Sequence, residues 1–297
     1  MKTITSFGEI LFDVYPYKRT LGGASFNFLY HIKKLTGGGS FVSSVGNDDL
    51  GKDILDFLKS NKISSEYIQI DKSRPTGMAN ANLDENKIPH WKIETNCAYD
   101  FIEPDERLAI LINDHTDCLY FGTLVQRSEL SRKTLHSLFG KKKKYFCDLN
   151  IRQNFYSKEI IEESLKASDV LKLNDEELKL LNDLFIKRNI DEISLAKAIS
   201  ENFEIELVCI TRGEKGAIIY AGGNSDHQKA AAENVVDTVG AGDAYAAILC
   251  LGYLQGREIS IINKIAAEFA GKIVGIRGAL PKDDRIYEKY KKELINE

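Results

Sequence analysis

The sequence predicts an α/β fold: a parallel sheet covered by helices on both faces, in three α/β/α layers, with a small β lid beside it. Short apolar runs alternate with helical patterns along most of the 297 residues, which is typical of this class. One stretch, Thr76–Asn96, alternates apolar and polar residues at period two instead, as a half-exposed hairpin does. No internal repeat or low-complexity segment interrupts this organisation.

Strands of the sheet are expected where apolar, often β-branched, residues occur in short runs. In chain order they are Thr3–Phe7, Phe41–Val45, Cys118–Phe121, Tyr145–Leu149, Val170–Leu173, Leu207–Thr211 and Ala217–Ala221. Helices are expected where apolar residues recur three and four positions apart. They are Phe26–Leu35, Asp53–Ser60, Ser128–Leu138, Ile160–Ala167, Asp175–Phe185, Ser194–Asn202, Asp243–Leu254 and Ile261–Val274.

The lid is expected from the hairpin, which turns at Asp84–Lys87, together with part of Val14–Thr20. The predicted division is a core domain of residues 1–13, 21–73 and 97–297, and a lid of residues 14–20 and 74–96. A free-standing hairpin would leave three apolar side chains partly exposed to solvent: Met78, Ile88 and Trp91. Because a lone two-stranded hairpin is marginally stable, we expect the lid to pair with a second copy and form a homodimer.

Bulk properties exclude several classes of protein. The net charge of −4 argues against a nucleic-acid surface, which needs a basic patch. The longest uncharged apolar run, Ala244–Leu254, is too short to span a bilayer, and Glu9 and Asp13 interrupt the apolar start, so we expect no signal peptide. The five cysteines form no C-x-x-C pair, which favours reduced thiols and a cytoplasmic protein.

Two glycine-rich patterns do not fit the common nucleotide motifs. Gly46–Asp53 matches G-x-x-x-x-G-K, but a P-loop needs Ser or Thr where Asp53 stands, so we interpret it as a β–α turn with an acidic helix start. The stretch around Gly240 and Gly242 fails as a dinucleotide fingerprint because Tyr245 occupies the last glycine position. Neither pattern therefore supports a Walker ATPase or a nicotinamide-dependent dehydrogenase.

The stretch VVDTVGAGDAYAAILCL, Val235–Leu251, combines a glycine turn with a carboxylate at the start of a helix. On its own it is also compatible with an Asp-capped helix after a flexible turn. A functional interpretation uses both parts: Gly240, Ala241 and Gly242 bring free N–H groups to a transferring phosphoryl group. Asp243 would then accept the proton of the attacking hydroxyl, and the helix start is expected to lower its pKa.

Several motifs, taken in order, give this chain a specific resemblance. DTVGAGDAYAA resembles the second signature of the ribokinase-like (PfkB) carbohydrate kinases, and GEILFDVYP, LGGASFNFLYHIKKL and VGNDDLG are similar to the first. YDFI, FGTLVQRSELSR and DLNIRQNFY look most like the bacterial fructokinase branch. The resemblance covers essentially the whole chain and implies a ribokinase-like sandwich with a β lid.

The resemblance implies roles at the sugar. Asp13 would accept hydrogen bonds from two sugar hydroxyls, and Gly22 and Gly23 would let the backbone approach the ring. Asn27 would hydrogen-bond the sugar, while Arg152 would reach the sugar or the transferring phosphate. Each also has an ordinary structural interpretation, as a strand end, a tight turn, a helix face or a surface salt bridge.

The resemblance also implies a nucleotide site. Asn174 would lie near the ATP phosphates and Glu177 would organise Mg²⁺ through water, although Asn174 and Glu177 equally form a capping box. Thr211 and Gly213 would approach the phosphates together with Gly240 and Gly242. The loop GIRGALP would line the adenine pocket and, with Asp237, hold a monovalent cation such as K⁺. Lys264–Val274 offers no Asn or His to bond the base.

The predicted function is ATP-dependent phosphorylation of a sugar hydroxyl, with D-fructose giving D-fructose 6-phosphate as the first choice. The leading alternative acceptor is 2-keto-3-deoxygluconate, because Arg152 would suit its carboxylate. Another sugar kinase of the family, or a catalytically silent sugar or nucleotide sensor on the same fold, are further alternatives. The sequence leaves open the natural sugar, the preferred nucleotide, cation activation and the oligomeric state.

Overall fold

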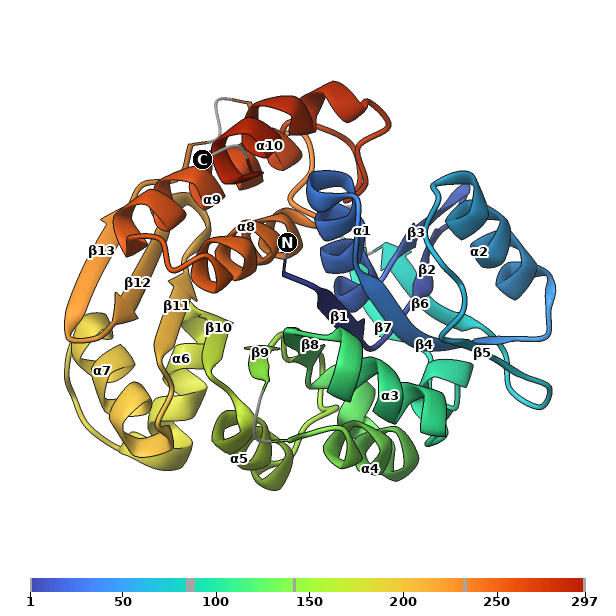
Figure 1. Cartoon of the computed structure of the whole chain (residues 1–297), viewed down its shortest axis with the longest axis horizontal. Coiled ribbons are helices and arrows are strands. Elements are labelled where there is room, and N and C mark those ends of the chain that lie inside the picture. The colour runs from blue at the N-terminus through green and yellow to red at the C-terminus, as the bar shows by residue number, and fades with distance from the viewer. Residues whose placement is uncertain (1, 84–88, 141–142, 232–233, 296–297) are drawn as a thin grey trace.

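Two β-sheets organise the chain (Figure 1), and this computed structural model describes residues 2–83, 89–140, 143–231 and 234–295. Within those residues the larger sheet has nine strands, in the order β13-β12-β11-β10-β9-β8-β1-β4-β5. They are β1 Ile4–Phe7, β4 Ser40–Gly46, β5 Ile68–Asp71, β8 Cys118–Gly122, β9 Lys144–Asp148, β10 Val170–Asn174, β11 Leu207–Thr211, β12 Ala217–Ala221 and β13 Asn224–Gln228. Strands from β5 to β11 run parallel, which confirms the prediction, and β12 and β13 add antiparallel pairings at one edge.

Helices cover both faces of this sheet, so the three-layer α/β/α sandwich is confirmed (Figure 1). One layer packs on the first buried cluster and contains α1 Ala24–Thr36, α2 Asp49–Ser60, α8 Ala241–Leu254, α9 Ile259–Val274 and α10 Glu288–Ile295. The other packs on the second cluster and contains α3 Glu106–His115, α4 Glu129–Ser137, α5 Lys158–Ala167, α6 Asp175–Leu181 and α7 Glu192–Phe203. In the described part of the chain, no helix is long and apolar enough to cross a membrane.

A second, smaller sheet stands beside the first, as the hairpin predicts. Its order is β3-β2-β6-β7, with β2 Leu11–Tyr15, β3 Lys18–Gly22, β6 Gly77–Leu83 and β7 Pro89–Ile93. The predicted turn Asp84–Lys87 and the residue Ile88 lie outside the described residues. The small lid sheet is thus confirmed, and it also takes in 11–13 and 21–22, whereas the division of the chain into two domains stays a prediction.

The sequence patterns miss four elements, β5, β13, α3 and α10, and physical reasons are evident for the first three. The edge strand β13 has the sequence NSDHQ, and it is recruited by backbone pairing to β12 instead of by apolar side chains. Helix α3 buries only three residues, Leu108, Leu111 and Ile112, so its apolar stripe is short. Strand β5 is a short edge strand that pairs only with β4 within the described residues.

Helix α2 starts earlier than predicted because its cap lies upstream. Asp48 accepts a hydrogen bond from the N–H of Gly51 at 2.7 Å, and the helix begins at Asp49 instead of Asp53. The other oxygen of Asp48 accepts the N–H of Thr76 at 2.8 Å. This confirms that Gly46–Asp53 is a β–α turn with an acidic helix start.

All five cysteines are buried and free. The nearest pair is Cys118 and Cys250, whose sulfur atoms lie 3.8 Å apart between β8 and α8. Burial raises the pKa of the Cys97 thiol to about 11 and that of Cys209 to about 12. The thiols are therefore free and shielded in the folded protein, as the sequence predicts.

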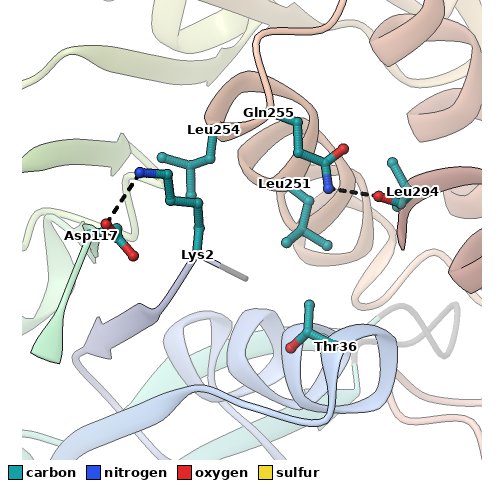
Figure 2. A pocket seen from close by; sticks show the side chains of 7 residues that line it. All are labelled: Lys2, Thr36, Asp117, Leu251, Leu254, Gln255 and Leu294. Carbon is teal, nitrogen blue, oxygen red and sulfur yellow. Dashed lines mark hydrogen bonds and ion pairs between the residues drawn. The ribbon is translucent and has the colours of Figure 1, made fainter. Parts of the chain in front are cut away.

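A cavity of about 630 Å³ lies at the amino ends of the parallel strands. Figure 2 shows its lining: Lys2, Thr36, Asp117, Leu251, Leu254, Gln255 and Leu294. Lys2 pairs with Asp117 at 3.3 Å, and the amide of Gln255 donates to the carbonyl of Leu294 at 2.7 Å. None of the predicted site residues lines this cavity.

Candidate active site

The predicted site residues converge at the opposite edge, where the parallel strands end. At that edge, residues of both sheets line a cavity of about 480 Å³, which we name the first cavity. Most predicted residues are among its lining: Asp13, Gly23, Asn27, Arg152, Asn174, Glu177, Thr211, Gly240, Gly242 and Asp243. A second cavity of about 530 Å³ shares Thr211 and Gly242 with it and also contains Gly213 and Ala241. Gly22 and Asp237 lie just behind these walls, in contact with residues described below.

Asp243 stands in the first turn of α8, next to a glycine in a left-handed conformation. Gly240 caps the helix with a φ of 79°, which disfavours any residue with a side chain. The rest of α8 is buried from Ala244 to Gly252, and this anchors the turn in the core. The N–H groups of a first helical turn have no partners inside the helix, so they are available to an anion in the cavity.

The carboxyl of Asp243 has a raised pKa, contrary to the sequence prediction. Loss of solvation raises it to about 7, and the nearby Asp148 carboxylate adds to this, against the Asn27 hydrogen bond and Lys172. The amide of Asn27 donates to Oδ2 of Asp243 at 2.8 Å. The stabilisation expected from the helix start is outweighed because the desolvation cost of a buried charge is larger.

A buried ion pair lies beside the glycine turn, and the sequence analysis missed it. The ammonium of Lys172 lies 2.9 Å from both oxygens of Asp148, and the hydroxyl of Tyr120 donates to the same carboxylate at 3.1 Å. Burial alone would lower the pKa of Lys172, but the Asp148 charge outweighs it, so the lysine stays cationic. A Cβ on Gly242 would lie 3.5 Å from its nitrogen. A lysine inside the apolar run of β10 was the available signal.

Asp13 presents an uncommitted carboxyl to the first cavity. No donor among the described residues hydrogen-bonds it, and burial raises its pKa to about 6, opposed by Arg152. A Cβ on Gly22 would lie 2.8 Å from Oδ2, so this glycine leaves room for the carboxyl. Arg152 itself is exposed at the rim and donates to the carbonyl of Ile151 at 3.2 Å.

Glu9 is a second acid of the first cavity that the analysis of motifs did not single out. Its carboxyl is buried, and it accepts hydrogen bonds from the N–H and the hydroxyl of Ser25 at 3.2 and 3.0 Å. Burial raises its pKa despite these bonds. This contact fixes the start of α1, which carries Asn27 two residues further on.

Asn174 and Glu177 form the predicted capping box at the start of α6. Asn174 accepts from the N–H of Glu177, and Glu177 accepts from that of Asn174, both at 2.8 Å. The second oxygen of Glu177 accepts the N–H of Ile151 at 2.6 Å. Each carboxyl oxygen keeps a lone pair, which suits contact with a metal through water.

The oxygen atoms around Glu177 suit a magnesium ion that is bound through water and substrate phosphates. No group of three or more His, Cys, Asp or Glu side chains that could cage a metal occurs among the described residues. Mg²⁺ commonly keeps several waters and takes its remaining oxygens from substrate phosphates. The residues present therefore fit an ion that arrives with a nucleotide rather than one resident in the protein.

The loop 275–281 closes the outer side of the glycine turn. Oδ2 of Asp237 accepts the N–H of Gly278 at 3.0 Å, and Oδ1 accepts that of Val239 at 3.1 Å. A Cβ on Gly240 would lie 2.3 Å from the Cβ of Ala279, so the loop and the turn are in direct contact. Asp237 thus holds the loop with one oxygen and the segment before the glycine turn with the other.

The second cavity is lined mainly by small and apolar residues. Alanine, glycine and valine dominate its described wall: Gly213, Gly216, Ala217, Ala230, Ala231, Val235, Ala241, Gly242, Ala267, Ala270, Gly271 and Val274. The hydroxyl of Tyr245, which also lines it, is committed to Asn263 at 2.6 Å. A flat, apolar ring fits this wall better than a charged group does.

Known proteins resemble this chain in sequence and in fold. The family described as "pfkB family carbohydrate kinase" matches residues 2–284. The chain is 29% identical to an ATP-dependent 6-phosphofructokinase of Thermoanaerobacterium thermosaccharolyticum, over 96% of the chain and 89% of that protein. It is 26% identical to probable fructokinase-5 of Arabidopsis thaliana, over 94% and 93%. A solved sugar kinase of Pyrococcus horikoshii superposes with a TM-score of 0.81 at 23% identity, over 99% of both chains.

Proposed function

This chain belongs to the pfkB family of carbohydrate kinases, and on that premise we propose that it transfers the γ-phosphate of ATP to D-fructose, forming D-fructose 6-phosphate. The observation that carries the proposal is that Asp243, the glycine turn of α8 and the uncommitted carboxyl of Asp13 line one cavity. The sugar lies on the Asp13 side, and the triphosphate reaches the turn from the second cavity.

Asp243 is the general base of the proposed reaction. Asn27 donates to Oδ2, which orients the carboxylate and leaves Oδ1 for the attacking hydroxyl of the sugar. A pKa of about 7 makes this carboxyl a good proton acceptor near neutral pH while half of it remains ionised there. The proton moves from the hydroxyl to Asp243 as the oxygen–phosphorus bond forms.

The transferred phosphoryl group meets positive charge on two sides. The start of α8, at Gly240, Gly242 and Asp243, lines the cavity, and the Lys172 ammonium lies beside Gly242. Fixed donors of this kind stabilise negative charge without reorganising, which is usually a large part of catalysis. A magnesium ion bound with ATP would neutralise phosphate charge, and Glu177 would reach it through water. Asp237 and the loop 275–281 are the candidates for holding a monovalent cation.

A neutral sugar suits the first cavity better than an acidic one. Glu9 and Asp13 line the sugar side, and Lys172 is already paired with Asp148. Arg152 is the remaining cation in the described lining, and it is exposed at the rim. The charge of this wall supports fructose over 2-keto-3-deoxygluconate, and over a phosphorylated acceptor of the kind the Thermoanaerobacterium relative is named for.

The lid sheet covers this cavity and is proposed to exclude water when substrate binds. Ala79, Trp91 and Ile93 line the cavity from the lid side. Trp91 packs edge-to-face on Tyr15 with ring centres 5.2 Å apart, which couples the two hairpins of the lid. We also propose a homodimer through the lid, in which Tyr17, 79% exposed at the hairpin tip, would become covered. A monomeric mass by light scattering at assay concentration would contradict that pairing.

The test is ADP release from ATP with a panel of acceptors: D-fructose, D-ribose, 2-keto-3-deoxygluconate, D-fructose 6-phosphate and adenosine. We expect the highest kcat/KM with fructose and little release without sugar. A higher value with 2-keto-3-deoxygluconate or with the phosphorylated sugar would overturn the fructose assignment and leave the kinase mechanism in place. If none of these acceptors raises ADP release above the rate without sugar, the result would favour a sensor instead.

A further inference from the structure

The loop that carries Arg152 has an uncommon backbone conformation. It joins β9 to α5, and its residues Asn150 and Gln153 have φ angles of 44° and 50°. Such left-handed angles are uncommon for residues other than glycine, and a glutamine tolerates them less well than an asparagine does. Contacts from outside the loop must therefore hold its shape, since the backbone does not favour it by itself.

One such contact joins the loop to the lid. Strand β7 forms an edge of the lid sheet, because β6 is its only partner strand within the described residues. The side-chain amide of Gln153 donates to the carbonyl of Trp91, in β7, at 2.6 Å. Trp91 also lines the first cavity. Gln153 thus ties the loop to the strand that bounds this cavity on the lid side.

Arg127 makes a second attachment of the loop to the lid. Its side chain is only 6% exposed, and its guanidinium donates to the carbonyl of Glu94, the residue after β7, at 2.6 Å. The carboxylate of Asp100 balances its charge through bonds of 2.7 and 2.8 Å. The guanidinium carbon also lies 4.5 Å from the centre of the Phe155 ring, at the far end of the loop. One buried cation therefore contacts both the lid and the loop.

Arg152 lies between these attachments and a third one at the nucleotide end. The N–H of Ile151 donates to Glu177 at 2.6 Å, so the loop is fixed just before Arg152. Arg152 lines the first cavity, and among the described residues its guanidinium bonds only the carbonyl of Ile151, at 3.2 Å. No acid of that part of the chain pairs with it, so the position of its backbone decides where the guanidinium can reach.

We propose that Gln153 and Arg127 are positioning residues: together they clamp the loop 150–155 to the edge of the lid and so set where Arg152 meets the acceptor sugar. Neither is among the described lining of the first cavity, so both act through Arg152 without touching substrate. The proposal rests on the proposed kinase function. A mobile side chain loses conformational entropy on binding, and a fixed backbone beneath it reduces that loss. Misplacement of a substrate-binding group by about 1 Å costs up to about 100-fold.

The first test shortens the clamp by one methylene group, in Gln153→Asn. Asparagine keeps the amide and tolerates the left-handed backbone, but its side chain is too short to reach the Trp91 carbonyl. We expect kcat/KM for D-fructose to fall about 10-fold and the KM for ATP to stay within about twofold. The control is Gln69→Asn in β5, outside both cavities, which loses similarly exposed bonds to the backbone of Glu103 and should behave as wild type.

A double-mutant cycle tests whether the clamp acts through Arg152. In an Arg152→Met background the guanidinium is gone, so Gln153→Asn should change kcat/KM for the sugar by less than about twofold. Arg127→Lys, which keeps a cation beside Asp100 and loses the planar contacts, should lower kcat/KM and show the same dependence on Arg152. A loss of equal size in both backgrounds would mean that the contacts only stabilise the fold, and it would overturn the proposal.

The fluorescence of Trp91 reports on the clamp in the absence of substrates. Trp91 is the only tryptophan of the 297 residues, so the signal comes from β7 alone. Loosening the edge should raise its quenching by acrylamide in Gln153→Asn and Arg127→Lys, and not in Gln69→Asn. Unchanged quenching in the first two would exclude the clamp. Wild-type protein that phosphorylates no acceptor in the panel would instead refute the kinase function, and the quenching would still decide whether the clamp exists.

Discussion

The first and the second cavity share the turn at the start of α8, yet they are built from different chemistry. The described lining of the first has five carboxyl groups and two cations, brought from strands and helices of both sheets. The described lining of the second has one charged side chain, Glu214, among small apolar residues. One substrate is therefore held mainly by charged side chains, and the other by backbone and shape.

Only the first cavity carries the energetic cost of burying several ionisable carboxyl groups. Raised carboxyl pKa values gather in the first cavity, at Glu9, Asp13, Glu177 and Asp243. Burial is the largest cause of each, so these groups are held in place against their preference for water. Perturbed groups of this kind in a cleft are typical of active sites. Substitutions in the first cavity should accordingly change rates far more than those in the second.

The largest effect is expected for Asp243→Asn. The amide keeps the size of the side chain and removes the proton acceptor, so turnover should fall by about 10²–10⁴-fold. Binding of sugar, measured by calorimetry, should be nearly intact because Asp13 and Glu9 are untouched. Retention of more than half of wild-type kcat, under conditions where chemistry limits the rate, would contradict the assignment of the base.

A smaller but clear loss is expected for Lys172→Met. It removes the cation beside Gly242 and leaves the Asp148 carboxylate buried and unpaired, so the fold should also lose about 3–5 kcal/mol. The double variant with Asp148→Asn removes the stranded charge and keeps an acceptor for Tyr120. Thermal unfolding should recover in the double variant, while kcat should stay at least about 10-fold low. Recovery of kcat together with stability would mean that the pair is purely structural.

The pH dependence of activity and of stability should report on the first cavity only, through the carboxyl of Asp243. Because Asp243 must be ionised to accept a proton, kcat/KM should rise with pH up to about 7 and level off above it. Stability should change in the opposite direction. The folded pKa is raised above its unfolded value of about 4, so the stability contribution of this group is present below pH 4 and lost as the pH rises through 7. Asp243→Asn should remove that loss and unfold at a higher temperature than wild type at pH 8.

The smallest effect is expected in the second cavity, on exchanging the nucleotide base. A wall of alanine, glycine and valine discriminates mainly by shape, and such pockets separate similar ligands by about 100-fold or less. Specificity constants for GTP and ITP should lie within that factor of the value for ATP. Discrimination beyond about 10³-fold would show that the base is read by hydrogen bonds, and the contrast between the two cavities would then be weaker than described.

The sequence predicts most of the main sheet because its strands are buried and apolar and its helices carry clear stripes. It misses β13, whose polar residues are held by backbone pairing, and α3, whose stripe is only three residues deep. Such elements depend on neighbours that no local pattern contains. The hairpin of the lid sheet is predicted from its period-two pattern, since one of its faces is exposed.

The site is predicted unevenly for a related reason. Motif residues such as Asp13, Asn27, Asn174 and Asp243 do line one cavity. Asp148 and Lys172 pair because the register of β9 against β10 makes them direct neighbours. Neither strand's own sequence determines that register. The pKa of Asp243 was predicted in the wrong direction because the helix start is visible in the sequence, whereas burial and the Asp148 charge are not.

The five buried thiols can report how often different parts of the molecule open. A thiol reagent cannot modify a shielded, protonated sulfur, so each labelling rate measures how often the surrounding structure opens. Cys97 lies in the small cluster that joins the lid to the main body, while Cys147 and Cys209 lie on opposite faces of the large sheet. Mass spectrometry of the labelled sulfurs would thus time the opening of the lid separately from that of each helical layer, in the unmodified chain.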